Sequence, residues 1–572
     1  MRVKKIANGI TVNAIAGTHI VFLGLNIDES KKSGFLGFAI QRTDHEENET
    51  YWLKGMKAFE TVVKYPVPGE SFSSLYHPIQ GFQWADYSAK PGRKYTYRVI
   101  CMYDDPKNLR QDGEVKVTIQ TEKELDGTHS VFFNRGSVAT QEYARRFQDK
   151  KPSEVGRGAY EWLSRGLLEA LIAFIKRAKA GDKLHGAIYE FQYGIKNENQ
   201  YDDVLLELKA AANRGVEVKI IYDDVEEYKS DGKPDGPWFE NREAIKEAKI
   251  TKLTKKRSNA KMMHNKFIVL SNANKNIAVW TGSTNLTENG IFGHSNLGHI
   301  VEDEVVADAY LDYWKRLYAD PEIDNDYRTA NMEASPVPEN LNNGTTPIFS
   351  PRSTKLDSLN WYAELASTAK KGLFMTFAFG MHELFREIYN QNDGILRMAL
   401  MEKAAVKKDG EALINELRKQ PNTIVAIGNR IPTNSFDRWL KEIDRVIPKL
   451  NVYWIHTKYM LVDPLGNTPV VISGSANFSK NSTDTNDENM LVIKGDKRIA
   501  DIYFCEYMRL YTHYAFRESV KRALENKKIG KAEEWAPQWL ATNDDWLKDY
   551  FTTGIDKAAK KLRRLYFSAS NS

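Results

Sequence analysis

Residues 8–122 contain short apolar runs at even spacing, with almost no helical period between them. Polar turns separate the runs, which read ITVNAIAG, HIVFLGLNI, FLGFAIQRT, TYWLKG, KYTYRVICMY and EVKVTIQT. Short, evenly spaced strands of this kind are typical of a small all-β sandwich. We therefore expect residues 1–125 to form a β-sandwich domain.

The segment AKPGRKYTYRVICMY refines that prediction. Pro91-Gly92 makes a turn, after which Tyr95, Tyr97 and Val99 alternate onto one face of a strand. The segment resembles the Pro-Gly-x-x-Tyr corner of fibronectin type III domains, and the resemblance implies that the tyrosine hydroxyl ties down the preceding loop. A generic β-hairpin turn is the alternative interpretation. Domains of the fibronectin type III kind are usually adaptors or binding modules, so we assign this region no chemistry.

From about residue 155 the apolar period becomes helical. The stretch GAYEWLSRGLLEALIAFIKRAKAGD spaces leucine and isoleucine along one face and predicts an amphipathic helix that ends at Gly181. A strand LHGAIYEF, a helix DDVLLELKAAANRG and a strand VEVKIIYDD follow. This order predicts a βαβ unit in a mostly parallel sheet.

The same order recurs in the second half of the chain. A helix LDSLNWYAELASTAKKG leads into a strand LFMTFAFG, a helix MHELFREIYNQNDG and a strand ILRMALMEK. The intervening stretch is rich in Pro, Asn, Thr and Gly and is typical of a linker. We therefore expect lobe 1 at residues 155–325, a linker at 326–352, lobe 2 at 353–520 and a C-terminal helical extension at 521–572.

Composition narrows the class of protein without choosing a substrate. The chain has 572 residues, too many for one core, and its 42% apolar and 27% charged content is ordinary for a soluble protein. The net charge of +5 permits binding to nucleic acid or to anionic lipid. Only Cys101 and Cys505 occur, and Asn8, Asn13 and His19 interrupt any signal-peptide core. We expect a cytoplasmic protein without a transmembrane segment, in which any membrane contact is peripheral.

One motif occurs twice with identical spacing. In each copy a histidine is followed two residues later by a lysine, 18 residues later by Gly-Ser and 21 residues later by an asparagine. The two copies consist of His264, Lys266, Ser283 and Asn285, and of His456, Lys458, Ser475 and Asn477. One copy alone is more often structural than functional, but two copies in the same register indicate a duplicated functional unit.

The paired motifs resemble the repeated H-x-K-x4-D and G-S/G-x-N signature of the phospholipase D superfamily, over residues 155–520. The resemblance implies an α/β fold with two lobes in an α/β/α sandwich and one active site at the pseudo-twofold seam. It also implies that a phosphodiester is cleaved through a phosphohistidine intermediate without a metal or other cofactor. Because one chain carries both half-sites, an oligomer is not required.

The residues suit this chemistry on physical grounds. Positions i and i+2 of a strand point to one face, so each histidine projects together with its lysine. Phosphoryl transfer needs a nucleophile, an acid for the leaving oxygen and cations around the phosphate. The asparagines can donate to phosphate oxygens, and Ser283 and Ser475 can brace the loops or bind phosphate. A metal site is disfavoured, because lysine is not a usual ligand and the motif has no carboxylate cluster.

The two copies differ in their carboxylates. Lobe 2 has Asp463 at the last position of H-x-K-x4-D, and Glu488-Asn489 follows where the superfamily has its acidic orienting residue. In lobe 1, Ser271 takes the aspartate position and Ser295-Asn296 stands in place of Glu488-Asn489. Lobe 1 therefore lacks both carboxylates.

Some two-lobed members of the superfamily pair the orienting carboxylate of one lobe with the histidine of the other. If that crossed pairing holds, Glu488 faces His264, fixes its tautomer and makes it the nucleophile. His456 then faces the neutral Ser295 region and serves as the general acid. An uncrossed pairing would exchange these roles.

The superfamily signature does not specify the substrate. We expect a phospholipid headgroup bond as the first possibility and DNA or RNA as the second, with a non-enzymatic phosphate-binding adaptor as a third. A basic run, KLTKKRSNAK at residues 252–261, could attract a polyanion, although a solvated loop is equally consistent with it. The aromatic tail from Trp535 to Phe551 could stack bases or lie at a lipid interface, but packing over lobe 2 is its ordinary explanation.

Overall fold

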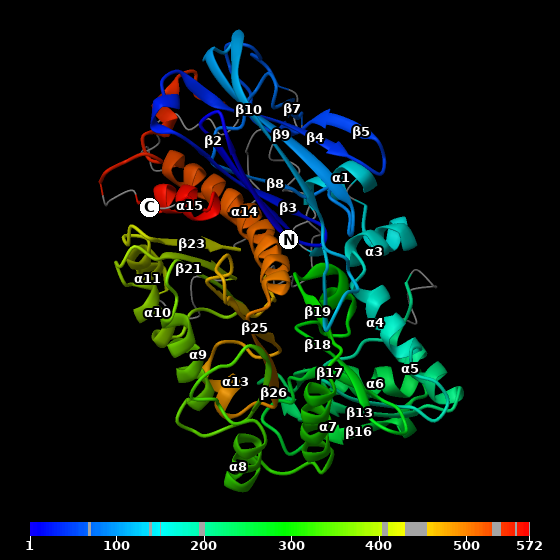
Figure 1. Cartoon of the computed structure of the whole chain (residues 1–572). Helices are drawn as coiled ribbons and strands as arrows, with labels where there is room; N and C mark the ends of the chain where they lie inside the picture. Colours follow the sequence, from blue (N-terminus) through cyan, green and yellow to red (C-terminus); the bar gives the residue numbers. More distant parts are fainter. Residues whose placement is uncertain are drawn as a thin grey trace.

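The computed structural model describes residues 1–66, 70–136, 140–148, 150–193, 201–402, 410–428, 455–528, 539–554 and 558–570. Two seven-stranded mixed sheets and a small antiparallel β region organise these residues (Figure 1). The predicted α/β class with a small all-β region before it is therefore confirmed.

The N-terminal region is a sandwich of two four-stranded antiparallel sheets, ordered β1-β2-β3-β8 and β10-β9-β4-β5. At the corner before β9, the Lys90 backbone N–H donates to the Tyr95 hydroxyl oxygen over 2.8 Å. The likeness to fibronectin type III domains stays a prediction. The strands are β1 (Arg2–Ala7), β2 (Ile10–Ala16), β3 (Val21–Ile27), β4 (Phe35–Asp44), β5 (Glu49–Trp52), β8 (Gln83–Asp86), β9 (Lys94–Asp105) and β10 (Asn108–Gln120), with a small hairpin of β6 (Lys54–Gly55) and β7 (Phe72–Ser73).

Lobe 1 is built on a sheet ordered β11-β19-β18-β17-β12-β13-β16. The single amphipathic helix predicted before it is two helices, because Arg165 and Gly166 both adopt positive φ and break the chain between them. The elements are β11 (His129–Phe133), α1 (Thr140–Phe147), α2 (Pro152–Val155), α3 (Arg157–Ser164), α4 (Leu167–Lys176), β12 (Lys183–Ile188), α5 (Val204–Asn213), β13 (Glu217–Asp223), β14 (Glu227–Tyr228), β15 (Pro234–Asp235), α6 (Trp238–Glu247), β16 (Thr254–Arg257), β17 (Lys266–Ser271), β18 (Asn276–Gly282), β19 (Leu297–Val301) and α7 (Glu304–Tyr318).

Lobe 2 repeats this topology with the order β20-β26-β25-β24-β21-β22-β23. Its elements are β20 (Gly344–Ser350), α9 (Asp357–Ser367), β21 (Gly372–Phe377), α10 (Glu383–Tyr389), β22 (Leu396–Met401), α11 (Gly410–Leu417), β23 (Thr423–Ile427), β24 (Tyr459–Val462), β25 (Val470–Gly474), α13 (Lys480–Asp484), β26 (Glu488–Lys494) and α14 (Lys497–Lys528). The residues predicted to be a linker contain most of α8 (Asn325–Ala334) and all of β20, which forms the edge of the lobe 2 sheet.

The expectation of mostly parallel sheets is wrong. Among the described strands of the two sheets, only β12-β13-β16 and β21-β22-β23 pair in parallel, as the βαβ patterns predict. The H-x-K segments lead into antiparallel hairpins, β17-β18 and β24-β25. The strands on this side of each sheet therefore pair antiparallel. Short polar turns of this kind favour hairpins over crossovers.

Helices α7 and α14 lie between the inner faces of the two sheets, where one hydrophobic core runs through both lobes. Along the H-x-K strands the faces alternate as expected, with Phe267 and Tyr459 in this shared core and Ile268 and Met460 in outer cores. The outer cores pack against α4–α6 in lobe 1 and α9–α11 in lobe 2. The shared core and the outer cores together hold the two H-x-K segments in fixed positions relative to each other.

The C-terminal segment returns to the N-terminal sandwich. Helix α15 (Ala558–Phe567) packs on β3, and the Asn13 side-chain amide donates to the Phe567 backbone oxygen over 2.8 Å. Trp546 packs against Phe35 and Phe82 of the sandwich, whereas Trp535 lies outside the described residues. Within the described part of the chain, no helix has the length and apolarity needed to span a membrane.

Candidate active site

Each H-x-K histidine lies just before its strand, in a segment that the opposite lobe holds. Strand β17 begins at Lys266 and β24 at Tyr459, so the histidines lie outside the sheet ladders. Met263 forms a β-bridge with Asp487 of lobe 2, and the His264 backbone N–H donates to the Asp487 backbone oxygen over 2.9 Å. Ile455 forms the equivalent bridge with Ser295 of lobe 1. The two motifs therefore meet at the seam between the lobes.

His264 is oriented by a carboxylate of the other lobe. Its Nδ1 lies 2.9 Å from Glu488 Oε2, and the Ser475 hydroxyl donates to the same oxygen over 2.6 Å. This is the crossed pairing. Burial lowers the pKa of His264 to about 4, although the Glu488 charge opposes that shift. At neutral pH the ring is therefore neutral, with its Nδ1–H donated to Glu488 and the Nε2 lone pair available.

His456 is oriented by a neutral group in the equivalent way. Its Nδ1 lies 2.9 Å from Asn296 Oδ1, to which the Ser283 hydroxyl also donates over 2.9 Å. Burial, together with the positive charges of Lys458 and His294, holds the pKa of His456 well below its usual range. Without a carboxylate partner, a protonated His456 gives up its proton readily.

The sequence comparison aligned Ser295 with Glu488, and the structure shows that this alignment is wrong by one residue. Asn296 is the residue that occupies the place of Glu488, and it lies 192 residues before it, the same offset that separates the two histidines. Ser295 instead accepts the His456 backbone N–H, and Asn489 donates to Thr281 and Tyr310. The offset of 192 was sufficient to find Asn296 from the sequence.

The two lysines are buried beside their histidines. Lys266 Nζ donates to the His264 backbone oxygen over 2.6 Å, and Lys458 Nζ donates to the His456 backbone oxygen over 2.8 Å. Burial lowers the pKa of Lys266 to about 7 and holds the pKa of Lys458 well below its usual range. An anion placed between the two ammonium groups would restore their charge.

Among the described residues, the Asn285 side chain has a hydrogen-bond partner. Its amide Nδ2 donates to Glu190 Oε2 over 2.6 Å. The Oδ1 atoms of both Asn285 and Asn477 are buried without a hydrogen-bond partner in the described part of the chain. Ser283 and Ser475 are fully buried, so these hydroxyls brace the orienting groups and do not face the phosphate position.

A family model described as "Cardiolipin synthase, PLD-like domain" matches residues 171–318 and 402–510, which include both H-x-K segments. These two segments are therefore similar to a phospholipase D-like domain. No curated protein sequence matches the chain significantly.

Several solved structures align with the chain at low identity. A phosphatidylserine synthase from Haemophilus influenzae Rd KW20 is 12% identical, with a TM-score of 0.41 over 63% of this chain and 90% of that one. A polyphosphate kinase from Porphyromonas gingivalis is 11% identical, with a TM-score of 0.38 over 65% and 52%. Nuc from Salmonella typhimurium, a phospholipase D family member, is 14% identical, with a TM-score of 0.23 over 30% and 94%.

Asp463, the last residue of the lobe 2 motif, holds the backbone at the start of β21. Its carboxylate accepts the backbone N–H groups of residues 370, 371 and 372 over 2.7–2.9 Å, where β21 begins. In lobe 1, Ser271 donates to Asn276, and Asp182 accepts the Lys179 N–H in the turn before β12. The turn before β12 thus has a carboxylate of its own, which accepts a different N–H group from those that Asp463 accepts.

We expect Asp463→Ala to lower the free energy of unfolding by about 1–3 kcal/mol, because three backbone donors lose their acceptor. Thermal or urea unfolding measures this change, and Ser271→Ala is the matched control in lobe 1. Activity of the folded Asp463→Ala protein should stay within about threefold of wild type. A large loss of kcat at unchanged stability would contradict a purely structural role.

The pKa of Lys266 predicts a bend in the pH profile. Its charged form predominates below about pH 7 and is lost above it, so log kcat/KM, which reports the free enzyme, should bend downward near pH 7. Lys266→Arg keeps its charge at all these pH values and should remove the bend, even if its overall activity is lower. If the bend near pH 7 persisted in Lys266→Arg, the titration of a group other than Lys266 would be its cause.

Three site neighbours were not predicted from the sequence. Tyr189 packs edge-to-face on His264 with ring centroids 4.8 Å apart, and Lys266 lies over its ring. His294 lies 5.5 Å from the His456 ring, and Glu190 contacts Asn285. Tyr189 and Glu190 directly follow the end of β12, so a polar end to a strand beside the H-x-K strand was the available signal.

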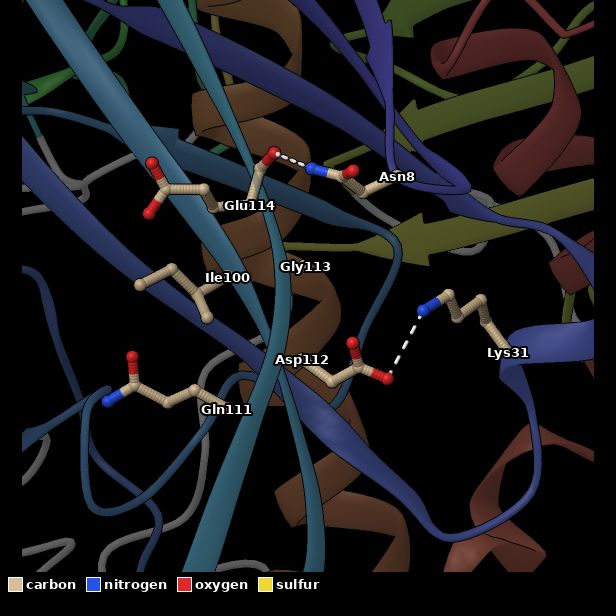
Figure 2. A pocket seen from close by; sticks show the side chains of 7 residues that line it. All are labelled: Asn8, Lys31, Ile100, Gln111, Asp112, Gly113 and Glu114. Atoms are coloured by element: carbon tan, nitrogen blue, oxygen red, sulfur yellow. Dashed lines mark hydrogen bonds and ion pairs between the residues drawn. The ribbon is translucent and has the colours of Figure 1, made fainter.

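Two other features do not add to the site. Among the described residues, no group of three or more His, Cys, Asp or Glu side chains could hold a metal ion. An open hollow of about 400 Å³ lies on the N-terminal sandwich, beside a bulge in β10 (Figure 2). Its polar groups already pair with each other, since Asn8 donates to the Glu114 backbone oxygen and Lys31 forms an ion pair with Asp112. We assign it no ligand.

Proposed function

We propose that the chain is a metal-independent phosphodiesterase of the phospholipase D type, acting on a phospholipid headgroup bond through a phosphohistidine intermediate. The observation that carries this proposal is the asymmetric crossed pairing, with Glu488 on His264 and Asn296 on His456. Two otherwise equivalent histidines are thereby given different partners, as a nucleophile and an acid require.

In the first step, the Nε2 lone pair of neutral His264 attacks phosphorus. The bond from phosphorus to the leaving oxygen breaks, and His456, which takes up a proton when the phosphate anion binds beside it, gives its Nε2 proton to that oxygen. Glu488 accepts the His264 Nδ1–H throughout and stabilises the positive charge that develops on the ring. The leaving group departs as a neutral alcohol, and a phosphohistidine remains on His264.

In the second step, neutral His456 takes a proton from water, which attacks the same phosphorus. The bond from phosphorus to His264 Nε2 breaks, so His264 returns to its neutral form and the product is a phosphomonoester. An alcohol in place of water would give a new phosphodiester by the same proton transfers. Lys266 and Lys458 lie beside the histidines and neutralise the phosphate oxygens in both steps.

The ion pairs that the basic run at residues 252–261 forms favour a lipid over a nucleic acid as the substrate. Arg257 is fully buried in ion pairs with Asp487 and Asp320, Lys256 pairs with Asp224, and Lys261 pairs with Glu227. These pairs compensate three of the five basic residues of the run, which leaves less charge to track a nucleic acid backbone. The matched family model, described as a cardiolipin synthase domain, also favours a phospholipid.

The test is a panel of phosphodiesters assayed in EDTA. Phospholipid vesicles with different headgroups should release the headgroup alcohol with wild type and not with His456→Ala. Cleavage of single- or double-stranded DNA or RNA, at a rate above that of every vesicle, would instead establish the nuclease alternative. Identical behaviour of wild type and variant on all substrates would reject the phosphodiesterase proposal.

A further inference from the structure

A carboxylate that the proposed mechanism does not use lies beside the phosphate position. Glu190 follows β12 by two residues, and its Oε2 accepts the Asn285 amide N–H over 2.6 Å. The Leu286 backbone N–H donates to the Glu190 backbone oxygen over 3.2 Å, and Phe191 forms a β-bridge with Leu286. Glu190 is therefore fixed on the loop that carries the signature asparagine.

The charge of Glu190 acts on the catalytic cations. Its carboxylate helps to oppose the burial that lowers the pKa of Lys266, after the larger contribution of Glu488. In turn, burial raises the pKa of Glu190, while Lys266 and the Asn285 hydrogen bond oppose that shift. A phosphate held by Lys266 and Asn285 would thus lie close to a fixed negative charge.

Lobe 2 has no carboxylate at the equivalent place. Ile188 of β12 is opposite Lys266, so Glu190 is two residues beyond the lysine partner. In β21, Met375 is opposite Met460, and the same register puts Phe377 opposite Lys458 and Phe379 in the place of Glu190. The phenyl ring of Phe379 is neutral and 46% exposed. The negative charge is therefore a feature of one side of the site.

We propose that Glu190 is a specificity-determining residue that disfavours dianionic phosphomonoesters relative to monoanionic phosphodiesters. The inference rests on the proposed function, because it concerns the phosphate position of that site. A diester keeps a single negative charge, whereas a monoester carries nearly two above its second pKa of about 6. Repulsion between like charges in a buried site therefore grows on conversion of substrate to product.

The consequence concerns turnover as well as selection. Hydrolysis replaces a monoanionic diester by a phosphomonoester, which gains its second charge within the site. Lys266 and Lys458 alone would bind that product more tightly than the substrate. Glu190 offsets part of this attraction, so it favours release of the product and lowers inhibition by free phosphate.

Glu190→Gln separates the charge from the structural role. Glutamine keeps a side-chain oxygen that can accept the Asn285 N–H, so only the negative charge is removed. Glu240→Gln is the matched control, because Glu240 is an exposed carboxylate whose charge acts on Glu190, whereas the charges that act on Lys266 are those of Glu488, Glu190 and Asp223.

The experiment compares the affinities of dimethyl phosphate and methyl phosphate for the full-length protein at about pH 8, by phosphorus NMR titration. Both ligands are measured on one protein at one pH, and Glu190→Gln is also made in Lys266→Arg, whose charge does not depend on Glu190, so a change in the protonation of Lys266 cannot account for the ratio. In Glu190→Gln we expect the ratio to shift by about tenfold toward methyl phosphate, and in Glu240→Gln by less than about twofold. A purely structural role would instead weaken both ligands equally.

An unchanged ratio in Glu190→Gln, or a shift toward dimethyl phosphate, would overturn the inference. Because binding is measured without turnover, the two proposals fail separately. A shifted ratio in a protein that cleaves no phosphodiester would reject the proposed function and keep the role of Glu190. An active wild type with an unshifted ratio would reject the role of Glu190 alone.

Discussion

His264→Ala lowers kcat/KM for a phosphodiester by about 10³-fold or more and abolishes the covalent intermediate. Losses of this size are usual when a nucleophile is removed and only binding and charge stabilisation remain. The structural reason is that the neutral His264 ring, with Nδ1 donated to Glu488, presents the Nε2 lone pair. No other described residue of the site is a neutral nucleophile held by a carboxylate in this way.

The matched variant is His456→Ala, measured on an ester with a good leaving group such as bis(p-nitrophenyl) phosphate. Nitrophenolate departs without an acid, so His456→Ala should still form the intermediate and release a burst of one equivalent of nitrophenol. His264→Ala should give no burst. A burst from His264→Ala and none from His456→Ala would reverse the two roles.

Glu488→Gln produces the second-largest loss, which we expect to be about 10²–10⁴-fold in kcat. The carboxylate is fully buried and accepts hydrogen bonds from both His264 and Ser475. An amide at this position offers the ring no negative charge, so the imidazolium formed in the first step is less stable. The amide N–H can also hold the wrong tautomer of His264 in place.

The pseudo-twofold relation between the two lobes provides a matched control for Glu488→Gln. Asn296 is the equivalent residue on His456, and Asn296→Asp adds the carboxylate that lobe 1 lacks. This variant should raise the pKa of His456 and shift the pH profile of kcat upward, with a smaller loss than Glu488→Gln. Equal losses in Glu488→Gln and Asn296→Gln would show that the charge on Glu488 has no special part.

Much of this fold could be predicted from periodicity. The strands of the N-terminal sandwich and the βαβ unit of each lobe followed from apolar spacing. The break at Arg165-Gly166 did not, because the apolar stripe continues through it and only the backbone turns. The hairpins that make the sheets mostly antiparallel were also missed, since a short apolar run gives no direction of pairing.

The candidate site divides in the same way. The His, Lys, Ser and Asn positions could be predicted because duplication repeats them at a fixed offset. The sequence comparison aligned Asn296 with Asn489, whereas in the structure Asn296 occupies the place of Glu488. The offset of 192 residues between the two histidines would have given the correct alignment. Glu190 had only the polar end of β12 as a signal and His294 had none, because both occur without repetition and reach the site only through tertiary packing.

The structural role of Asp463 shows a further limit of motif reading. Its place in the signature suggests chemistry, yet its carboxylate caps the start of β21 through backbone N–H groups. In lobe 1, Ser271 donates to Asn276 instead, and the turn before β12 is held by Asp182, which accepts the Lys179 N–H.

The central claim is that His264 carries the phosphoryl group, and trapping the intermediate tests it most directly. Wild-type protein is mixed with a labelled phosphodiester, quenched in base, where phosphohistidine is stable, and digested for mass spectrometry. We predict a single phosphorylated peptide with the modification on His264, absent from His264→Ala and, when the substrate is a nitrophenyl ester whose leaving group needs no acid, accumulated in His456→Ala. Phosphate on His456 in the wild type, or turnover without any phosphohistidine, would contradict this account.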